Sequence, residues 1–486
     1  MAVLLTAVGV LAAWWHHAQG YPLYYGDAEA HLNIARRVVD SRTPGYDQIG
    51  TVWLPLPHVL TMPFVRSLDL WRSGMAGTIP GVACFVLAGT LLFALARFAF
   101  ASAAAAFAAA LLFALNPNVL YLATTPMTEP VYFAALAGVV YFTVRGNAIA
   151  AGLFSCAASL TRYEGWALIP AAGVVFLIAH GFRRAFAFGL VASVAPLYWL
   201  GHNWVYFGNP LEFYNGPHSN IMINRGPYPG EHDWPKAWLY YRSAVQLCAG
   251  WGLVIAGAVG MPAALFRRAW WAVALLAVSP AFVMLSMHSS NSPIFLPHLW
   301  PNSYYNTRYG LAALPLLAFT GAALVALLPD RFRAMGAAAV VVAATLPWLA
   351  HSRPDAWITW KESQVNSEAR RAWTKEAADF FKANYRSGDG IVFGFGDLTG
   401  VVRVAGIPMR ELLHDGNNPQ FDAVLARPDL FLHEQWALTI SADRVATALL
   451  KLSRSGVHYQ LVKSIPAKNN PPVEIYRRVR PLPTLP

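Results

Sequence analysis

The feature that most restricts the fold of this 486-residue chain is a series of long apolar segments in its first 350 residues. An apolar stretch of roughly 17–25 residues is long enough to cross a lipid bilayer as a helix. Eleven segments are predicted to do so, at about residues 2–18, 76–96, 98–116, 129–145, 148–162, 166–181, 185–201, 243–264, 269–287, 309–328 and 334–350. The sequence therefore predicts a mainly α-helical, polytopic transmembrane bundle.

Charged residues are distributed unevenly along the chain. Residues 351–486 hold 32 of the 61 Lys, Arg, Asp and Glu residues, which is about 24% of that segment, against about 8% of residues 1–350. Soluble domains carry about 25% charged residues. We therefore predict a transmembrane domain at 1–350 and a small soluble α/β domain at 351–486. Within the latter, residue periodicity predicts a helix at 363–385 and strands at 391–395, 457–463 and 473–478.

The overall composition excludes several classes of protein. With 56% hydrophobic and 13% charged residues, the chain is neither an ordinary cytosolic enzyme nor a disordered protein. The net charge of +11 would suggest nucleic-acid binding in a soluble protein, but here the excess Arg lies between apolar segments, so no nucleic-acid partner is expected. Cys84, Cys156 and Cys248 lie inside apolar segments and predict no disulfide framework. Scattered histidines predict no zinc site, and the need for another divalent metal stays open.

The gaps between apolar segments predict an orientation in the membrane. Short gaps are rich in Arg and contain few acids, and the positive-inside rule places such gaps in the cytoplasm. Their basic residues are Arg97, Arg145, Arg183, Arg184, Arg267, Arg268, Arg331 and Arg333. The long polar loops at 19–75, 202–242 and 288–308, together with 351–486, then lie on the extracytoplasmic side.

The first long loop contains an unusual group of ionisable residues at the membrane boundary. Asp27, Glu29 and His31 occur within five positions, and His58 follows before the second apolar segment. A simpler interpretation is that Asp27 caps a helix and that Glu29 favours its N-terminus. We favour a functional role for Asp27, because capping does not explain two carboxylates and a histidine in a chain so poor in acids.

Three further positions on the same predicted face carry ionisable residues. Glu129 begins a predicted helix, where it could simply complement the helix dipole. Arg162 and Glu164 lie between two apolar segments and could simply pair with neighbours, but ionisable residues at membrane depth are costly and usually functional. Arg308 precedes Tyr309 at a helix end; it could reach toward lipid headgroups, or it could hold a phosphate through two parallel hydrogen bonds.

Carboxylates and arginines on one membrane face fit the transfer of a group from a lipid-linked phosphate. A carboxylate would take a proton from an acceptor, and arginines would stabilise the negative charge of the leaving phosphate. One alternative is a transporter or flippase, which would place its charges near the middle of the bilayer, between related halves. Another is a membrane scaffold whose soluble domain binds a partner.

Five short segments, spread in order over about 300 residues, resemble the GT-C superfamily of integral membrane glycosyltransferases. The resemblance is to its protein mannosyltransferase and aminoarabinose transferase branch. The matching segments are GDAEAHLNIAR (26–36), PMTEP (126–130), LTRYEG (160–165), YFGNP (206–210) and RYG (308–310). The resemblance does not extend clearly into the C-terminal domain.

The resemblance implies an inverting transferase that uses a polyprenyl-phosphate sugar as donor. Its acceptor would be a protein, a glycolipid or a glycan. The Ala- and Arg-rich composition favours a bacterial inner membrane, and the charge pattern places the active site and the C-terminal domain on the periplasmic side. The catalytic base would be Asp27 or, because the spacing departs from the adjacent Asp-Glu pair of eukaryotic members, Glu29. Glu129 would be a second acid, which orients the acceptor or, in members that use a metal, binds it. The donor phosphate would be bound by Arg162, Arg308 and Tyr309. Beside these residues, we expect His31, His58, Tyr163 and Glu164 to bind the acceptor or to shape the site.

Overall fold

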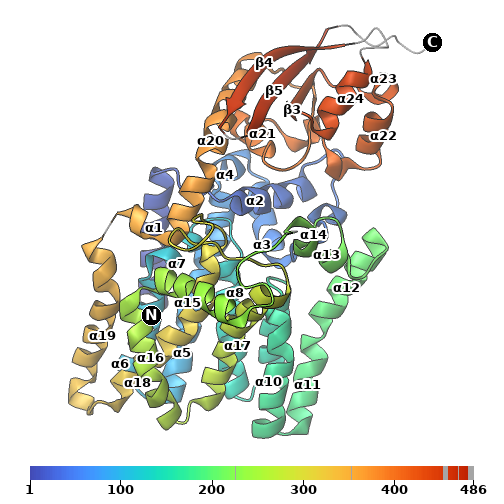
Figure 1. Ribbon diagram of the computed structural model, residues 1–486. Coiled ribbons are helices and arrows are strands. Elements are labelled where there is room, and N and C mark those ends of the chain that lie inside the picture. The colour runs from blue at the N-terminus through green and yellow to red at the C-terminus, as the bar shows by residue number, and fades with distance from the viewer. Residues whose placement is uncertain (225, 352, 453–457, 469, 480–486) are drawn as a thin grey trace. The chain divides into compact units, whose positions relative to one another are not determined.

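The computed structural model describes residues 1–224, 226–351, 353–452, 458–468 and 470–479 (Figure 1). The chain is divided into two compact units. The first, here called the helical unit, comprises 1–22, 50–57 and 78–365. The second, here called the α/β unit, comprises 23–49, 58–77 and 366–486. The α/β unit thus includes segments of the first long loop, while the membrane boundary predicted at residue 350 stays a prediction.

The helical unit is built from apolar helices. Its elements are α1 (Ala2–Ala18), α5 (Met75–Phe100), α6 (Ala103–Ala114), α7 (Pro117–Ala123), α8 (Glu129–Val144), α9 (Ala148–Ser159), α10 (Glu164–His180), α11 (Phe182–Ala192), α12 (Val194–Phe207), α13 (Glu212–Asn215), α14 (Asn220–Ile223), α15 (Trp234–Ala249), α16 (Trp251–Phe266), α17 (Trp270–Ser289), α18 (Leu314–Leu327) and α19 (Asp330–Ala350), with the short 3₁₀ helices η2 (Thr307–Ala313) and η3 (Pro354–Ala356). Many of the long helices run alongside one another (Figure 1).

Several of these helices can cross a membrane. In the described part of the chain, five are long and apolar enough, or seven if each of two bent helix pairs is one crossing. Shorter apolar helices, among them α1, α8, α9 and α10, occupy other predicted segments. The predicted fold class, a polytopic helix bundle with a small α/β domain, is confirmed.

One predicted helix is wrong. The segment 243–264 is two helices, α15 and α16, which meet at Gly250 with a bend of 111°. Gly250 has a φ of +78°, a conformation that residues with a Cβ atom rarely adopt. A Cβ atom there would also lie 2.8 Å from the ring of Trp348. Uniform hydropathy hid this break, because hydropathy does not register backbone direction.

The α/β unit combines loop helices with a small sheet. Its helices are α2 (Gly26–Val39), α3 (Leu56–Val65), α4 (Leu68–Ser73), α20 (Ile358–Asn384), α21 (Thr399–Ala405), α22 (Gln420–Ala426), α23 (Pro428–Phe431) and α24 (Arg444–Leu452), with 3₁₀ turns η1 (Tyr46–Ile49), η4 (Met409–Glu411) and η5 (Asp415–Asn417). The first residues of two of these helices, 56–57 of α3 and 358–365 of α20, belong to the helical unit. Its strands are β1 (Ile391–Val392), β2 (Leu412–Leu413), β3 (Trp436–Ile440), β4 (Tyr459–Ala467) and β5 (Asn470–Arg478).

The five strands form one sheet in the order β2-β1-β3-β5-β4. Strand β1 is parallel to β2 and β3, whereas β5 is antiparallel to β3 and β4. The helix predicted at 363–385 lies almost wholly within α20, and the predicted strands overlap β1, β4 and β5. Residue 457, at the start of one predicted strand, lies outside the described residues. Strands β2 and β3 were not predicted.

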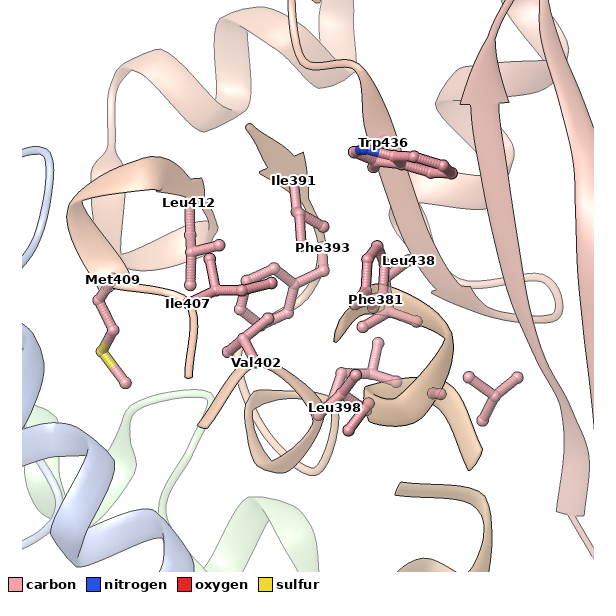
Figure 2. Close-up of a cluster of buried hydrophobic side chains, with 14 of the residues drawn as sticks. Phe381, Ile391, Phe393, Leu398, Val402, Ile407, Met409, Leu412, Trp436 and Leu438 are labelled. Carbon is pink, nitrogen blue, oxygen red and sulfur yellow. The ribbon is translucent and has the colours of Figure 1, made fainter. Parts of the chain in front are cut away.

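Alternate side chains of the sheet enter two hydrophobic clusters. Ile391 and Leu438 belong to a cluster with Phe381 of α20 (Figure 2). Val392 and Ala437 belong to the opposite cluster, with helices α22 and α24. Because successive side chains of a strand point to opposite faces, the sheet is buried on both sides.

The first cluster also includes part of the first long loop. Leu32 and Ala35 of α2 and Trp71 of α4 are fully buried in it. At about 25 cal/mol per Å² of buried apolar surface, large apolar side chains stabilise a fold by roughly 1.5–3 kcal/mol each. The segment that carries Asp27 and Glu29 is therefore part of the folded α/β unit rather than a loose connection.

Candidate active site

A buried polar network lies where α8 begins in the helical unit. Glu129 is the first residue of α8 and is only 4% exposed. Its Oε1 atom accepts hydrogen bonds from Arg162 Nη1 and Arg308 Nε, both at 3.1 Å. One carboxylate oxygen thus joins two arginines that are 146 positions apart in the sequence.

Arg162 lies in the turn between α9 and α10 and has two further partners. Its Nε donates to Glu164 Oε1 at 2.9 Å, and its Nη1 also donates to Thr128 Oγ1 at 3.2 Å. The ring of Tyr309 lies 5.2 Å from the guanidinium carbon of Arg162 and 5.4 Å from that of Arg308. Both guanidinium groups are therefore within cation–π distance of one aromatic ring.

Glu362 of α20, which the sequence analysis did not identify, is the third carboxylate close to these arginines. It is 2% exposed and lies 3.5 Å from Arg308 Nη1. Its carboxylate accepts the backbone N–H groups of Asn306 at 3.1 Å and Thr307 at 2.8 Å, together with the Thr307 hydroxyl. Glu362 thus fixes the start of η2, the 3₁₀ helix from which Arg308 and Tyr309 project.

One atom of this network has no partner. Among the residues that the structure describes, nothing donates to the buried Oε2 atom of Glu129. A buried carboxylate oxygen normally accepts a hydrogen bond, because leaving it without one is costly. The Oε2 atom of Glu129 can therefore accept a hydrogen bond from a donor outside the chain, such as the hydroxyl or amine of a ligand.

Tyr163 is engaged in packing next to this network. Its hydroxyl donates to the carbonyl of Val52 at 2.9 Å, and its ring stacks on Phe213 with centroids 5.1 Å apart. Trp199 Nε1 lies 3.4 Å from the same hydroxyl. These contacts hold segment 50–57 against α10 and α12, so Tyr163 shapes the surroundings of Arg162.

The remaining predicted residues belong to the α/β unit. Asp27 lies in the first turn of α2 and is half-buried. The interpretation of Asp27 as an N-cap is wrong, because the N-cap residue is Tyr25 and α2 begins at Gly26. The first turn is an electropositive position at which Asp27 stays compatible with either helix stabilisation or catalysis.

Glu29 forms an ion pair with Arg403 that uses both of its carboxylate oxygens. It is 6% exposed, its Oε2 accepts from Arg403 Nη2 at 2.8 Å, and its Oε1 accepts from Arg403 Nε and, at 3.0 Å, from Asn33. Burial by itself would raise the pKa of Glu29, but the Arg403 guanidinium outweighs this effect and lowers the pKa below its usual value. Both oxygens are therefore occupied by a strongly held partner.

His31 and His58 contact each other in the α/β unit. Nδ1 of His31 lies 2.9 Å from Nε2 of His58, and both side chains are buried. One ring must donate and the other accept, so the pair links α2 to α3 through a single shared hydrogen.

Comparison with known proteins identifies the fold. No protein-family model matches the chain, and no curated protein matches it significantly. The crystal structure of ArnT from Cupriavidus metallidurans in the apo state is similar, with a TM-score of 0.57 and 14% sequence identity. The match covers 98% of this chain and 97% of that one. ArnT is an aminoarabinose transferase of the GT-C type. This chain has the GT-C fold.

Within this GT-C fold, the predicted residues form two groups. The helical unit brings together Glu129, Arg162, Glu164, Arg308 and Tyr309, which come from three different sequence segments. The α/β unit contains Asp27, Glu29, His31 and His58. In both units the described residues include no group of three or more His, Cys, Asp or Glu side chains that could hold a metal ion.

The sequence contained a weak signal for Glu362. It is an acid that follows the last predicted transmembrane segment by twelve residues, within a segment predicted to be soluble and rich in charge. In such a segment one Glu is unremarkable. Only its backbone partners at Asn306 and Thr307 distinguish it from the other acids of that segment.

Proposed function

We propose that the chain is a glycosyltransferase that moves a sugar from a polyprenyl-phosphate donor to an acceptor, with inversion at the sugar's anomeric carbon. The acceptor class is a protein, a glycolipid or a glycan. The reaction takes place at the periplasmic face of a bacterial inner membrane, where the α/β unit also lies.

The observation that carries this proposal is the buried Glu129–Arg162–Arg308 network beside Tyr309, in a chain with the GT-C fold. Two guanidinium groups close together are suited to a phosphate, because each can donate parallel hydrogen bonds to phosphate oxygens. A single glutamate oxygen between them keeps both charges in place before the donor binds.

The proposed reaction is a single displacement. A lone pair of the acceptor oxygen or nitrogen forms a bond to the anomeric carbon as the bond from that carbon to the phosphate oxygen breaks. The electron pair leaves with polyprenyl phosphate, whose growing negative charge Arg162 and Arg308 stabilise. The base takes the acceptor's proton. Attack opposite the leaving group inverts the anomeric configuration.

Asp27 is the proposed base, in preference to Glu29. Both oxygens of Glu29 are bonded to Arg403, and its lowered pKa makes it a weak proton acceptor. Asp27 is only half-buried and lies two residues earlier on α2. In this proposal Glu129 orients the arginines and offers its second oxygen to a ligand, while His31, His58, Tyr163 and Glu164 maintain the shape of the site.

The position of the charges favours a transferase over a transporter or flippase. Glu129 is the first residue of α8, and Arg162 lies between α9 and α10. The ionisable residues are thus at helix ends, whereas a transporter of this size places its substrate site near the middle of the bilayer.

The test measures release of polyprenyl phosphate, a product shared by every sugar and acceptor of this reaction. Purified protein is added to membranes from a strain that lacks it, which retain both the donor and the unmodified acceptor. Mass spectrometry follows polyprenyl phosphate and the mass gained by the acceptor. Wild-type protein is expected to produce both, whereas Arg308→Gln and Asp27→Asn produce neither above about 1% of the wild-type rate.

The matched control is Arg331→Gln, which removes a positive charge from the start of α19, where that side chain is exposed. This variant is expected to retain wild-type activity. Normal transfer by both Arg308→Gln and Asp27→Asn, in correctly folded protein, would contradict the proposed site. Movement of intact sugar-lipid across vesicles without bond cleavage would instead support a flippase.

A further inference from the structure

A second basic site lies at the other end of α8. A cavity of about 520 Å³ is lined by residues of the turn between α8 and α9 and by Arg184 near the start of α11. Glu129 begins α8 and Val144 ends it, so 16 residues of helix, about 24 Å, lie between the polar network and this cavity. The cavity is therefore separate from the proposed catalytic site.

Two arginines provide the charge of this cavity. Arg145 follows α8 directly, and its guanidinium carbon lies 5.2 Å from the centre of the Phe98 ring. Arg184 is exposed and lines the same cavity. Within the described ranges, no carboxylate pairs with either guanidinium. Two guanidinium groups that line one cavity without a carboxylate partner are chemically suited to an anion.

The turn between the helices positions one of these arginines. Gly146 has a φ of +71°, and a Cβ atom there would lie 2.8 Å from Arg184 Nη1 and 2.9 Å from His180 Nδ1. His180 Nε2 in turn lies 2.9 Å from the carbonyl oxygen of Thr143. The ends of α8 and α10 are thus joined, and the absence of a side chain at residue 146 lets the Arg184 guanidinium lie against the turn.

The rest of the cavity wall is apolar. Tyr141 and Phe142, from the last turn of α8, line it together with Ile149 of α9, which is 52% exposed. Continuing along α11, Phe182 and Phe186 are 72% and 62% exposed. A basic cavity next to exposed apolar surface at the end of membrane helices matches a phospholipid, which has a phosphate at one end and hydrocarbon chains at the other.

We propose that this cavity binds the headgroup phosphate of an anionic phospholipid, in the leaflet opposite the catalytic site. Arg145 and Arg184 donate to the phosphate oxygens, and Tyr141, Phe142 and Ile149 contact the upper part of the acyl chains. Arg145 and Arg184 belong to the short basic turns that the charge pattern assigns to the cytoplasm, where anionic headgroups attract basic residues. This inference does not depend on the proposed transferase activity.

The test compares lipid retained by the full chain after purification in mild detergent. Arg145→Gln/Arg184→Gln removes both cavity charges. The matched control, Arg183→Gln/Arg331→Gln, removes the same charge from exposed arginines outside the cavity. Mass spectrometry of co-purified lipid is expected to show at least three-fold less phosphatidylglycerol per protein in the cavity variant than in wild type or control. Equal retention in all three proteins would overturn the proposal.

A second measurement distinguishes the binding of a lipid from the binding of free phosphate. It uses the wild-type protein, so its result does not depend on whether the double variant folds. The thermal midpoint of wild-type protein is followed as phosphatidylglycerol, phosphatidylcholine or inorganic phosphate is added to the micelles. We expect a saturable rise with phosphatidylglycerol that exceeds the effects of the other two, and a smaller rise in Gly146→Ala, whose new Cβ atom displaces Arg184. An equal rise with inorganic phosphate would overturn a lipid site, as would equal rises with both lipids.

Discussion

Two buried glutamates of this chain, Glu29 and Glu129, use their carboxylates in contrasting ways. In the α/β unit, Glu29 has both oxygens bonded to the single guanidinium of Arg403, with Asn33 as a further donor. In the helical unit, one oxygen of Glu129 receives both Arg162 and Arg308, and the other oxygen has no partner among the described residues. A closed pair stabilises a fold, whereas an incompletely satisfied network is able to accept a ligand.

The largest expected effect comes from the open network. Glu129→Gln should lower the rate of sugar transfer by about 10²–10³-fold, because two arginines lose the charge that orients them and an oxygen offered to the ligand becomes an amide. The rate is measured as polyprenyl phosphate release. Glu368→Gln, an exposed position on α20, is the control and should be unchanged. A ten-fold or smaller loss in Glu129→Gln would show that Glu129 resembles Glu29 in being structural.

Substitution in the Glu29–Arg403 ion pair should have the opposite effect, lowering the stability of the fold rather than the rate of transfer. Glu29→Gln leaves the Arg403 charge buried without its counterion, which costs about 3–5 kcal/mol of folding free energy. Transfer activity per folded molecule should stay within a few-fold of wild type. Thermal unfolding and hydrogen exchange of α2 and α21 measure the loss. Unchanged stability with abolished transfer would make Glu29, rather than Asp27, the candidate base.

The α/β unit should also lose stability as pH falls, because of another buried group. Burial, together with the charges of Arg37 and Arg42, lowers the pKa of His414 to about 3. The unfolded chain binds a proton near pH 6.5 and the folded chain does not. Stability is therefore full above pH 6.5 and falls by about 1.4 kcal/mol per pH unit from there toward pH 3.

Glu29 should act in a lower pH range. Its pKa is lowered by Arg403, so its contribution is present above its ordinary pKa near 4.5 and is lost as pH falls below that value. Denaturant titrations between pH 7 and 5 should thus give a slope that His414→Gln reduces and Glu29→Gln retains. A slope unchanged in His414→Gln would assign the pH dependence to other groups.

The smallest effect should come from the aromatic ring beside the two arginines. A cation–π contact contributes about 0.5–2 kcal/mol, so Tyr309→Leu should lower transfer by about 2–30-fold. Tyr309→Phe retains the ring and should stay within about two-fold of wild type. A large loss in Tyr309→Phe would mean that the hydroxyl, rather than the ring, contacts the substrate.

Much of the helical unit was predictable because its signal is local. Apolar composition over about twenty residues predicts a membrane helix wherever the segment occurs, and the predicted segments overlap apolar helices from α1 to α19. Glu129, Arg162 and Arg308 stood out for the same reason, as rare charges at the ends of apolar segments. The break at Gly250 was missed because a bend changes direction without changing hydropathy.

The sheet and the partners of the charges were less predictable. Strands β2 and β3 pair with β1, but two-residue β2 has too little periodicity to be recognised. Nothing in the sequence near Glu29 indicates Arg403, 374 positions away, and nothing near Arg308 indicates Glu362. Ion pairs of this kind depend on which segments meet in the folded chain.

The sequence by itself determined that this is a membrane protein with a small α/β domain, and which charges were too costly at membrane depth to be incidental. Only the tertiary structure decided that both carboxylate oxygens of Glu29 are hydrogen-bonded, whereas one oxygen of Glu129 has no partner among the described residues. The physical reason is that hydrophobicity is a property of each segment, whereas satisfying a buried charge requires a partner brought from elsewhere in the chain.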